Sequence, residues 1–154
     1  MGRSCRQMDV LKFKQVALSS FSVTINQMRL LGIDYGLKRI GLALSDGGLV
    51  KPLKVIFNNS RTIEEIVKIC QQEEIEKVIM GISEGLKKEI LFFGNKLKKK
   101  INLSIIFEDE TLTTKVSIAK MIRTSTKQKM RKKKIDAVAA AQILEEYIRG
   151  GENV

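Results

Sequence analysis

The 154-residue chain lacks histidine and tryptophan entirely, and it contains only one proline and two cysteines. Without histidine, Ser-His-Asp and Cys-His catalytic systems and His-based zinc sites are excluded. Cys5 and Cys70 are too few for a disulfide framework or a four-thiolate metal site, and we expect Cys70 to be a buried, inert thiol. No apolar run approaches the roughly 20 residues that a membrane span needs. Acid–base or metal chemistry must therefore use carboxylates, lysines, tyrosines or thiols.

Positive charge is what the chain has in excess. It carries 28 Lys and Arg against 17 Asp and Glu, a net charge of +11. Such an excess favours polyanionic partners, nucleic acid first and an anionic membrane surface second. The low cysteine content fits a reducing cytoplasm best. The length and the 44% hydrophobic content allow one domain with a real core.

We divide the chain into a 28–149 domain, an N-terminal extension over residues 1–27 and a short tail over 150–154. The extension has basic residues and serines but no strand or helix period. It reads as a transit-type peptide, a flexible tail or the product of a start codon placed too early. Met28, directly before the first strong strand pattern, is a plausible alternative start.

Strand and helix patterns succeed one another through the domain. Asp46-Gly-Gly48 is a hairpin signal between two apolar runs, and Gly32 and Gly41 inside such runs indicate a close backbone approach or a bulge. Thr62 with Glu65 forms a capping-box signature. The predicted strands cover 29–34, 39–45, 49–57, 77–82 and 103–108, and the predicted helices begin at Thr62 or cover 84–100, about 115–123 and 135–148. This order predicts an α/β domain with a mixed five-stranded sheet, its first three strands antiparallel, and helices on both faces.

Three sets of acids stand out from the surface glutamates. Asp34 ends an apolar strand, so its carboxylate should emerge at the carboxyl edge of the sheet, where open α/β sheets hold ligands. Glu108-Asp109-Glu110 follows another strand, and three acids there repel one another unless a cation offsets them. Asp136 is expected in the first turn of the last helix. Taken singly, each of these two acids has a structural explanation about as good as a functional one. Asp34 would be a turn residue, and Asp136 would be a helix-dipole partner.

Considered jointly, Asp34, Glu110 and Asp136 would form an all-carboxylate site suited to Mg²⁺ or Mn²⁺. Two such ions can clamp a phosphodiester and activate water. Beside Asp136 lies a basic segment, expected as a loop, whose cations would hold phosphates. Its candidate nucleic-acid-binding residues are Lys129, Arg131, Lys132, Lys133 and Lys134. The lysines of 96–100 are expected to be a solvated helix face.

Three blocks of the sequence together resemble the YqgF family, also called RuvX. They are Leu31-Gly-Ile-Asp-Tyr-Gly-Leu-Lys-Arg-Ile-Gly41, Asp109-Glu-Thr-Leu-Thr-Thr114 and Lys133-Lys-Ile-Asp-Ala-Val-Ala-Ala140, and the resemblance covers about residues 29–148. It implies an RNase H-like fold and a metal-dependent endonuclease that trims the 5′ end of pre-16S rRNA. Members were long described as Holliday junction resolvases, which act on branched DNA.

The resemblance also implies residue roles. Asp34, Glu110 and Asp136 match the family's acids, and Lys38 and Arg39 match a Lys-Arg pair that would contact phosphate. Gly36 matches the turn glycine, and Thr113 and Thr114 match a threonine pair that would orient Glu110 or cap the following helix. The chain departs from the family at Thr111, usually Arg, and at Gly81-Ile-Ser-Glu-Gly85, which replaces a Gly-Leu-Pro segment.

Two other classes of protein remain open from the sequence. A phosphotransferase of the actin and sugar-kinase type has a similar strand–Asp-x-Gly–hairpin opening, but it needs two such domains to enclose ATP. A non-catalytic nucleic-acid-binding protein would use the acids for capping and solubility only. The sequence does not separate an RNA substrate from branched DNA, because phosphate contacts carry no base information.

Overall fold

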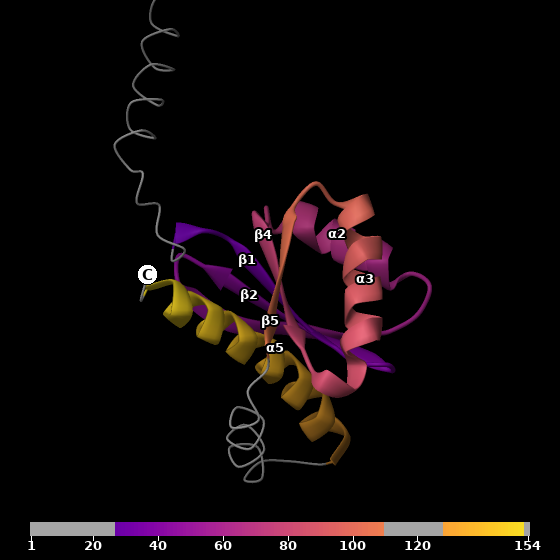
Figure 1. Ribbon diagram of the computed structural model, residues 1–154. Helices are drawn as coiled ribbons and strands as arrows, with labels where there is room; N and C mark the ends of the chain where they lie inside the picture. The colour runs from indigo at the N-terminus through magenta and orange to yellow at the C-terminus, as the bar shows by residue number, and fades with distance from the viewer. Residues whose placement is uncertain (1–26, 110–127, 153–154) are drawn as a thin grey trace, which may run out of the picture.

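Five strands form one mixed sheet in the order β3-β2-β1-β4-β5. The structure is a computed structural model that describes residues 27–109 and 128–152 (Figure 1). The strands are β1 Leu30–Tyr35, β2 Arg39–Asp46, β3 Leu49–Phe57, β4 Lys77–Ile82 and β5 Ser104–Asp109. The helices are α2 Thr62–Gln72, the short 3₁₀ turn η2 Glu84–Leu86, α3 Lys87–Lys100 and α5 Gln128–Glu152.

Strand directions divide the sheet into two halves. β1, β2 and β3 pair antiparallel, and β1, β4 and β5 pair parallel. Gly47 and Gly48 both have positive φ, of 59° and 84°, and close the β2–β3 hairpin with a conformation that favours glycine. The predicted mixed five-stranded sheet with an antiparallel first half is confirmed.

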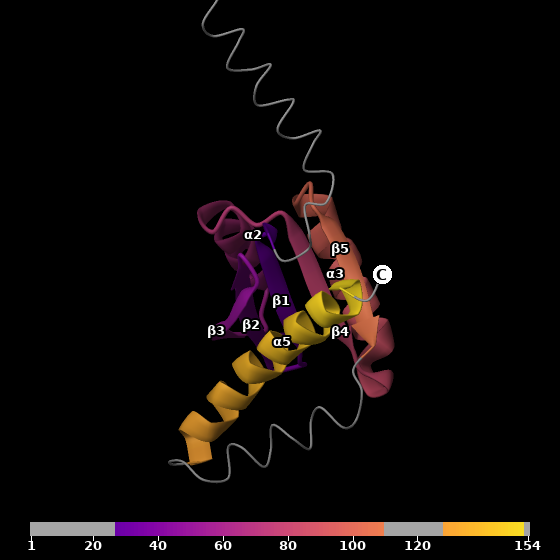
Figure 2. The same cartoon turned by 90° about the vertical axis from the view of Figure 1, so that its left-hand side faces the viewer.

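Helices cover both faces of the sheet. α2 and α3 lie on one face and α5 lies on the other (Figures 1 and 2). Side chains along β1 alternate between the two faces of the sheet. Leu31 and Ile33 pack with α2 and α3, whereas Leu30 packs with α5. On the α2–α3 side, Cys70 is buried as predicted.

Glycine allows α5 to approach the sheet closely. A Cβ placed on Gly32 would meet Leu144 Cγ at 2.6 Å and the backbone oxygen of Ala140 at 2.7 Å. One on Gly41 would collide with the backbone oxygen of Asp136. Of the two alternatives predicted for these glycines, the structure shows the close approach at both, and it fixes α5 directly above β1 and β2.

Two helix starts differ from the sequence prediction. The capping box at Thr62 is wrong, because this residue is already inside α2 and its side chain makes no cap. Instead Thr62 Oγ1 accepts the Asn59 N–H at 2.8 Å and donates to the Phe57 carbonyl at 3.0 Å, so it fastens the preceding turn. The predicted 84–100 helix starts as the turn η2 before α3 begins at Lys87.

The last helix is longer than predicted at both ends. α5 begins at Gln128 instead of residue 135, so the basic segment is helical and not a loop, and it continues through Gly150 and Gly151 to Glu152. Asp136 therefore lies in the third turn of α5 and not in its first. A run of lysines and arginine is compatible with helix, since both residues have high helix propensity.

Residues 1–26, which make up nearly all of the predicted N-terminal extension, and the helix predicted over about 115–123 lie outside the described residues. The division of the chain into an extension, a domain and a tail stays a prediction. None of the helices within 27–109 and 128–152 is long and apolar enough to cross a membrane.

Candidate nuclease site

Two acids and two glycines form one cross-strand row on the face of the sheet that α5 covers. Asp34 on β1 pairs with Gly41 on β2, and Gly81 on β4 pairs with Glu108 on β5. The β1–β4 ladder runs to the pair Ile33↔Met80, so Asp34 and Gly81 are the next residues along it. Because adjacent strands lie about 4.8 Å apart, the row spans the carboxyl ends of the three parallel strands.

Asp136 joins this row from α5. Its backbone oxygen lies against Gly41, which is the register partner of Asp34. The two carboxylate residues are about a hundred positions apart in the sequence, yet they sit on neighbouring elements at one place. Both residues are partly exposed. The structure thus brings Asp34 and Asp136 together.

An ion pair connects Asp136 to the sheet. Arg39 Nε lies 3.3 Å from Asp136 Oδ2, and the two side chains are 29% and 25% exposed. Burial raises the pKa of Asp136 above its ordinary value, and the Arg39 guanidinium acts in the opposite direction. Arg39 was predicted to contact phosphate, and in the structure its partner is this carboxylate.

Glu108 is an acid of the row that the sequence did not single out from Glu108-Asp109-Glu110. Burial raises the pKa of Glu108, and repulsion from Glu146 on α5 and from Asp109 adds to the effect. The available signal was strand alternation: Ile106 packs under α5, so Glu108, two residues on, faces the same way.

The turn that follows Asp34 depends on Gly36. A Cβ at this position would meet the backbone oxygen of Arg39 at 2.5 Å, and the Gly36 carbonyl accepts a hydrogen bond from Asn58 Nδ2 at 2.9 Å. Lys38 follows in the same turn and is exposed. Gly36 therefore shapes the β1–β2 turn beside the site.

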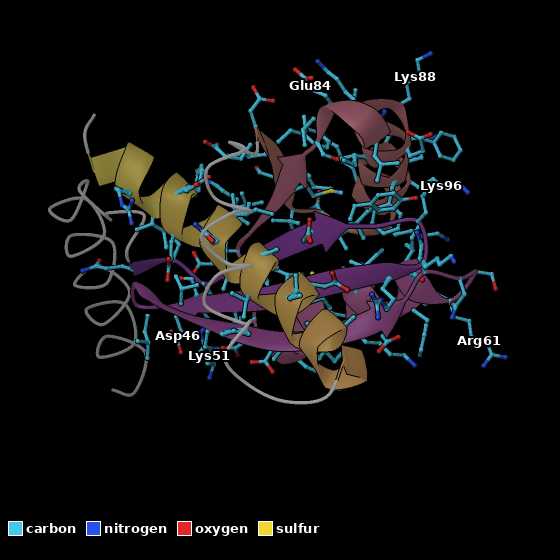
Figure 3. All side chains as sticks on the ribbon, turned by 90° about the horizontal axis from the view of Figure 1, so that it is seen from below. Asp46, Lys51, Arg61, Glu84, Lys88 and Lys96 are labelled. Carbon is cyan, nitrogen blue, oxygen red and sulfur yellow. The ribbon has the colours of Figure 1, made fainter. Side chains whose placement is uncertain are left out.

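Several predicted site residues cannot be placed. Glu110, Thr113 and Thr114 lie outside the described residues. The basic residues Lys129, Arg131, Lys132, Lys133 and Lys134 belong to the first turns of α5, but only their backbone is described. The lysines of α3, of which Figure 3 labels Lys88 and Lys96, lie across the sheet from α5.

The donor set fits a hard divalent cation as far as it is described. Asp34 and Asp136 supply carboxylate oxygens, the ligands that Mg²⁺ and Mn²⁺ prefer. Gly41 and Gly81 flank Asp34 in the row, and the backbone of Asp136 lies directly over Gly41. Within residues 27–109 and 128–152, no cluster of three or more Cys, Asp or Glu residues could hold a metal ion. The third predicted ligand, Glu110, is outside these ranges.

Comparison with solved structures identifies the class of fold. Thermus thermophilus RuvC, solved in complex with a Holliday junction substrate, matches with a TM-score of 0.53 and 13% identity, over 80% of this chain and 94% of that one. A fowlpox virus resolvase bound to Holliday junction DNA matches with a TM-score of 0.52 and 15% identity, over 80% and 98%. With the observed strand order, these matches define an RNase H-like fold.

Sequence comparison then gives the family. The model of the RuvX family, described as Holliday junction resolvase, matches residues 28–150. A Sulfurihydrogenibium protein named "Putative pre-16S rRNA nuclease" is 37% identical over 131 residues, 78% of this chain and 89% of the relative. A Clostridium acetobutylicum protein of the same name is 34% identical over 132 residues, 79% and 98%. The chain belongs to the RuvX family.

Proposed function

We propose that this protein is a divalent-metal-dependent endonuclease that processes the 5′ end of pre-16S rRNA in the cytoplasm. Membership in a family of nucleases supports hydrolysis of phosphodiester bonds as its reaction. The single observation that carries the metal-dependent part is the placement of Asp136 against Gly41, the strand partner of Asp34. Two carboxylates at the carboxyl end of a parallel sheet suit the capture of hard cations.

Asp34, Glu110 and Asp136 would hold the cation, and Glu110 enters this set from its position in the sequence alone. A pair of Mg²⁺ or Mn²⁺ ions bound there would supply activation of water and stabilisation of the leaving oxygen. The fold contributes rigidity: Asp34 is on a strand in the centre of the sheet and Asp136 is inside a long helix. Their spacing is therefore set by packing and does not depend on loops.

Phosphate binding is assigned to the basic residues around this site. Lys38 is exposed in the turn after Asp34, and the sequence places Lys129, Arg131, Lys132, Lys133 and Lys134 on α5 just before Asp136. Basic side chains on both sides of the carboxylates would bind the phosphate backbone of the nucleic-acid substrate. Thr113 and Thr114 stay assigned, from the resemblance, to orienting Glu110. The rRNA substrate is supported by the names of the relatives.

The test incubates the full chain with pre-16S rRNA and with a four-way DNA junction, each in Mn²⁺ or EDTA. We expect Mn²⁺-dependent cleavage of the rRNA near its mature 5′ end. Asp34→Asn and Asp136→Asn should abolish the product while retaining the wild-type circular dichroism spectrum. Glu64→Gln is the matched control, since it removes one exposed carboxylate on α2, across the sheet. Cleavage that survives EDTA or both site variants would refute the proposal.

Resolution of branched DNA is the second candidate, and the description of the matching family model favours it. It uses the same carboxylates and the same chemistry. Product from the junction alone would select this candidate, and product from the rRNA alone would remove it. Binding of both substrates without any product would instead indicate a non-catalytic nucleic-acid-binding protein.

A further inference from the structure

The contact between Arg39 and Asp136 places a fixed positive charge on a carboxylate assigned to cation binding. Arg39 is the first residue of β2, and its Nε lies 3.3 Å from Asp136 Oδ2 on α5. Both side chains are well sheltered, at 29% and 25% exposed, compared with 45% and 43% for the Lys54–Glu65 pair on the other face. Shelter from solvent weakens screening, so solvent screens this pair less than the Lys54–Glu65 pair, which is shorter at 2.7 Å but more exposed.

The position of Arg39 follows from the strand pairing. Gly41, two residues along β2, carries the backbone of Asp136 on the α5 face, and strand alternation directs Arg39 to that same face. The guanidinium is therefore held at the site by the fold and not by a mobile loop. A carboxylate partly removed from water needs such a partner, because an unpaired buried charge is costly.

We infer that Arg39 is the resident counter-cation of Asp136, which a divalent ion entering the site displaces from Oδ2, freeing the guanidinium for a substrate phosphate. This inference rests on the proposed function, since it takes Asp136 as a ligand. A dication and a guanidinium at one carboxylate repel each other, so the ion pair competes with metal binding. The freed guanidinium is a good phosphate ligand because its planar fork matches phosphate oxygens.

The experiment measures Mn²⁺ binding to the full chain without nucleic acid, by electron paramagnetic resonance of the free ion. Arg39→Gln removes the competing charge, and we expect it to bind Mn²⁺ about tenfold more tightly than the wild type. Lys54→Gln is the matched control: it removes one positive charge and one ion pair on the opposite face. Its Mn²⁺ affinity should stay within about twofold of the wild type, as expected for a distant, screened charge.

A second measurement follows the released guanidinium. In Ca²⁺, used as a probe cation in place of Mn²⁺, the wild type should bind RNA more tightly than in EDTA. Arg39→Gln should lose most of this gain. If Arg39→Gln fails to melt cooperatively, Arg39→Lys replaces it. Lysine keeps the charge but loses the fork, so Mn²⁺ should bind more tightly than to the wild type by a smaller factor.

The outcomes separate this inference from the proposed function. Unchanged or weaker Mn²⁺ binding by a folded Arg39 variant overturns the inference alone, as long as the single Asp34→Asn variant loses Mn²⁺ binding. That loss shows that Mn²⁺ binds at the proposed site. Absence of Mn²⁺ binding in the wild type and in the Arg39 variants overturns both. Equal tightening by Lys54→Gln also overturns the inference, since it would show a response to net charge and not to this ion pair.

Discussion

The α-carbon of Gly41 faces the backbone carbonyl of Asp136 so closely that no methyl group fits between β2 and α5. This contact holds the third turn of α5 beside Asp34, the strand partner of Gly41. Packing at one glycine therefore determines the relative position of two carboxylates. Its effect on stability and on the site can be measured separately.

We expect Gly41→Ala to destabilise the protein by about 1–3 kcal/mol, the usual cost of overpacking. The added methyl group must push α5 away from the sheet, because its neighbour is backbone and not a flexible side chain. Mn²⁺ binding should weaken even at temperatures where the variant is folded. Thermal melts and Mn²⁺ titrations check both effects. Gly85→Ala is the control, since nothing lies within 4 Å of a Cβ at that glycine. A Gly41→Ala variant as stable as Gly85→Ala would contradict the prediction.

Cys70 should be unreactive in the folded protein. Burial raises the pKa of the Cys70 thiol from 9.0 to about 11, so almost no thiolate exists at pH 8. The folded pKa lies above the unfolded one, so this group's contribution to stability is complete below about pH 9 and is lost as the pH rises through about 11. A Cys5→Ser background leaves one thiol for the disulfide reagent DTNB. We expect slow reaction at pH 8 and fast reaction in guanidinium chloride. Fast labelling of the folded chain would show that the thiol is accessible.

Arg29 should contribute more to stability than an ordinary surface cation. Its Nη1 donates to the Glu73 carbonyl at 3.2 Å and to Glu74 Oε2 at 3.1 Å, and its Nε lies 3.5 Å from Asp46 Oδ1. We expect Arg29→Gln to cost about 1 kcal/mol, which corresponds to a fall of about 2–4 °C in Tm at this chain length. Lys54→Gln breaks one exposed pair and should cost less. Equal melting temperatures for the two variants would argue against a network at Arg29.

Charge reversal at Lys132 and Lys133 should weaken RNA binding and flatten its salt dependence. If both residues contact phosphate, the slope of log K against log[salt] should fall by about 1.5 in magnitude, since each contact contributes about 0.7–0.9. Reversal of Lys98 and Lys99 makes the same change in net charge on α3, across the sheet from α5. The slope should change little in that pair. Equal effects of the two double variants would show that RNA binding depends on the net charge of the protein and not on Lys132 and Lys133.

The sheet was predictable because its signals are local. Apolar runs with the right period and turn glycines at 47 and 48 define the strands, and their order limits the topology. Gly32 and Gly41 were recognised as sites of a close backbone approach or a bulge, but the sequence did not say which element would approach. The ends of helices were harder to predict. A lysine-rich segment has no apolar period, so the first turns of α5 could not be distinguished from a loop.

Faces of helices were also difficult to assign. The helical period over 84–100 predicts an inner face with Leu91, Phe92 and Leu97, but in the structure Phe92 is 65% exposed and Phe93 is buried. Adjacent aromatic residues differ by about 100° around a helix, and the sequence does not say which of them faces the sheet.

For the site, local patterns offered Asp34 and Asp136 as candidates with a structural explanation for each, and their convergence with Glu110 was a hypothesis from the joint interpretation and the family resemblance. Their proximity arises from the contact between β2 and α5, which depends on the whole fold. The Arg39–Asp136 ion pair could not be predicted for the same reason.

The unbroken course of α5 fixes the rotation of the basic residues proposed to bind phosphate relative to Asp136. Its 25 residues form a rod of about 37 Å, and Figure 2 shows its first turns extending past β3. Inserting one alanine between 134 and 136 would rotate the basic turns by about 100° relative to Asp136 without altering the net charge. Under the proposed function, such an insertion would leave the cation ligands in place but misalign the bound phosphate backbone with the carboxylates.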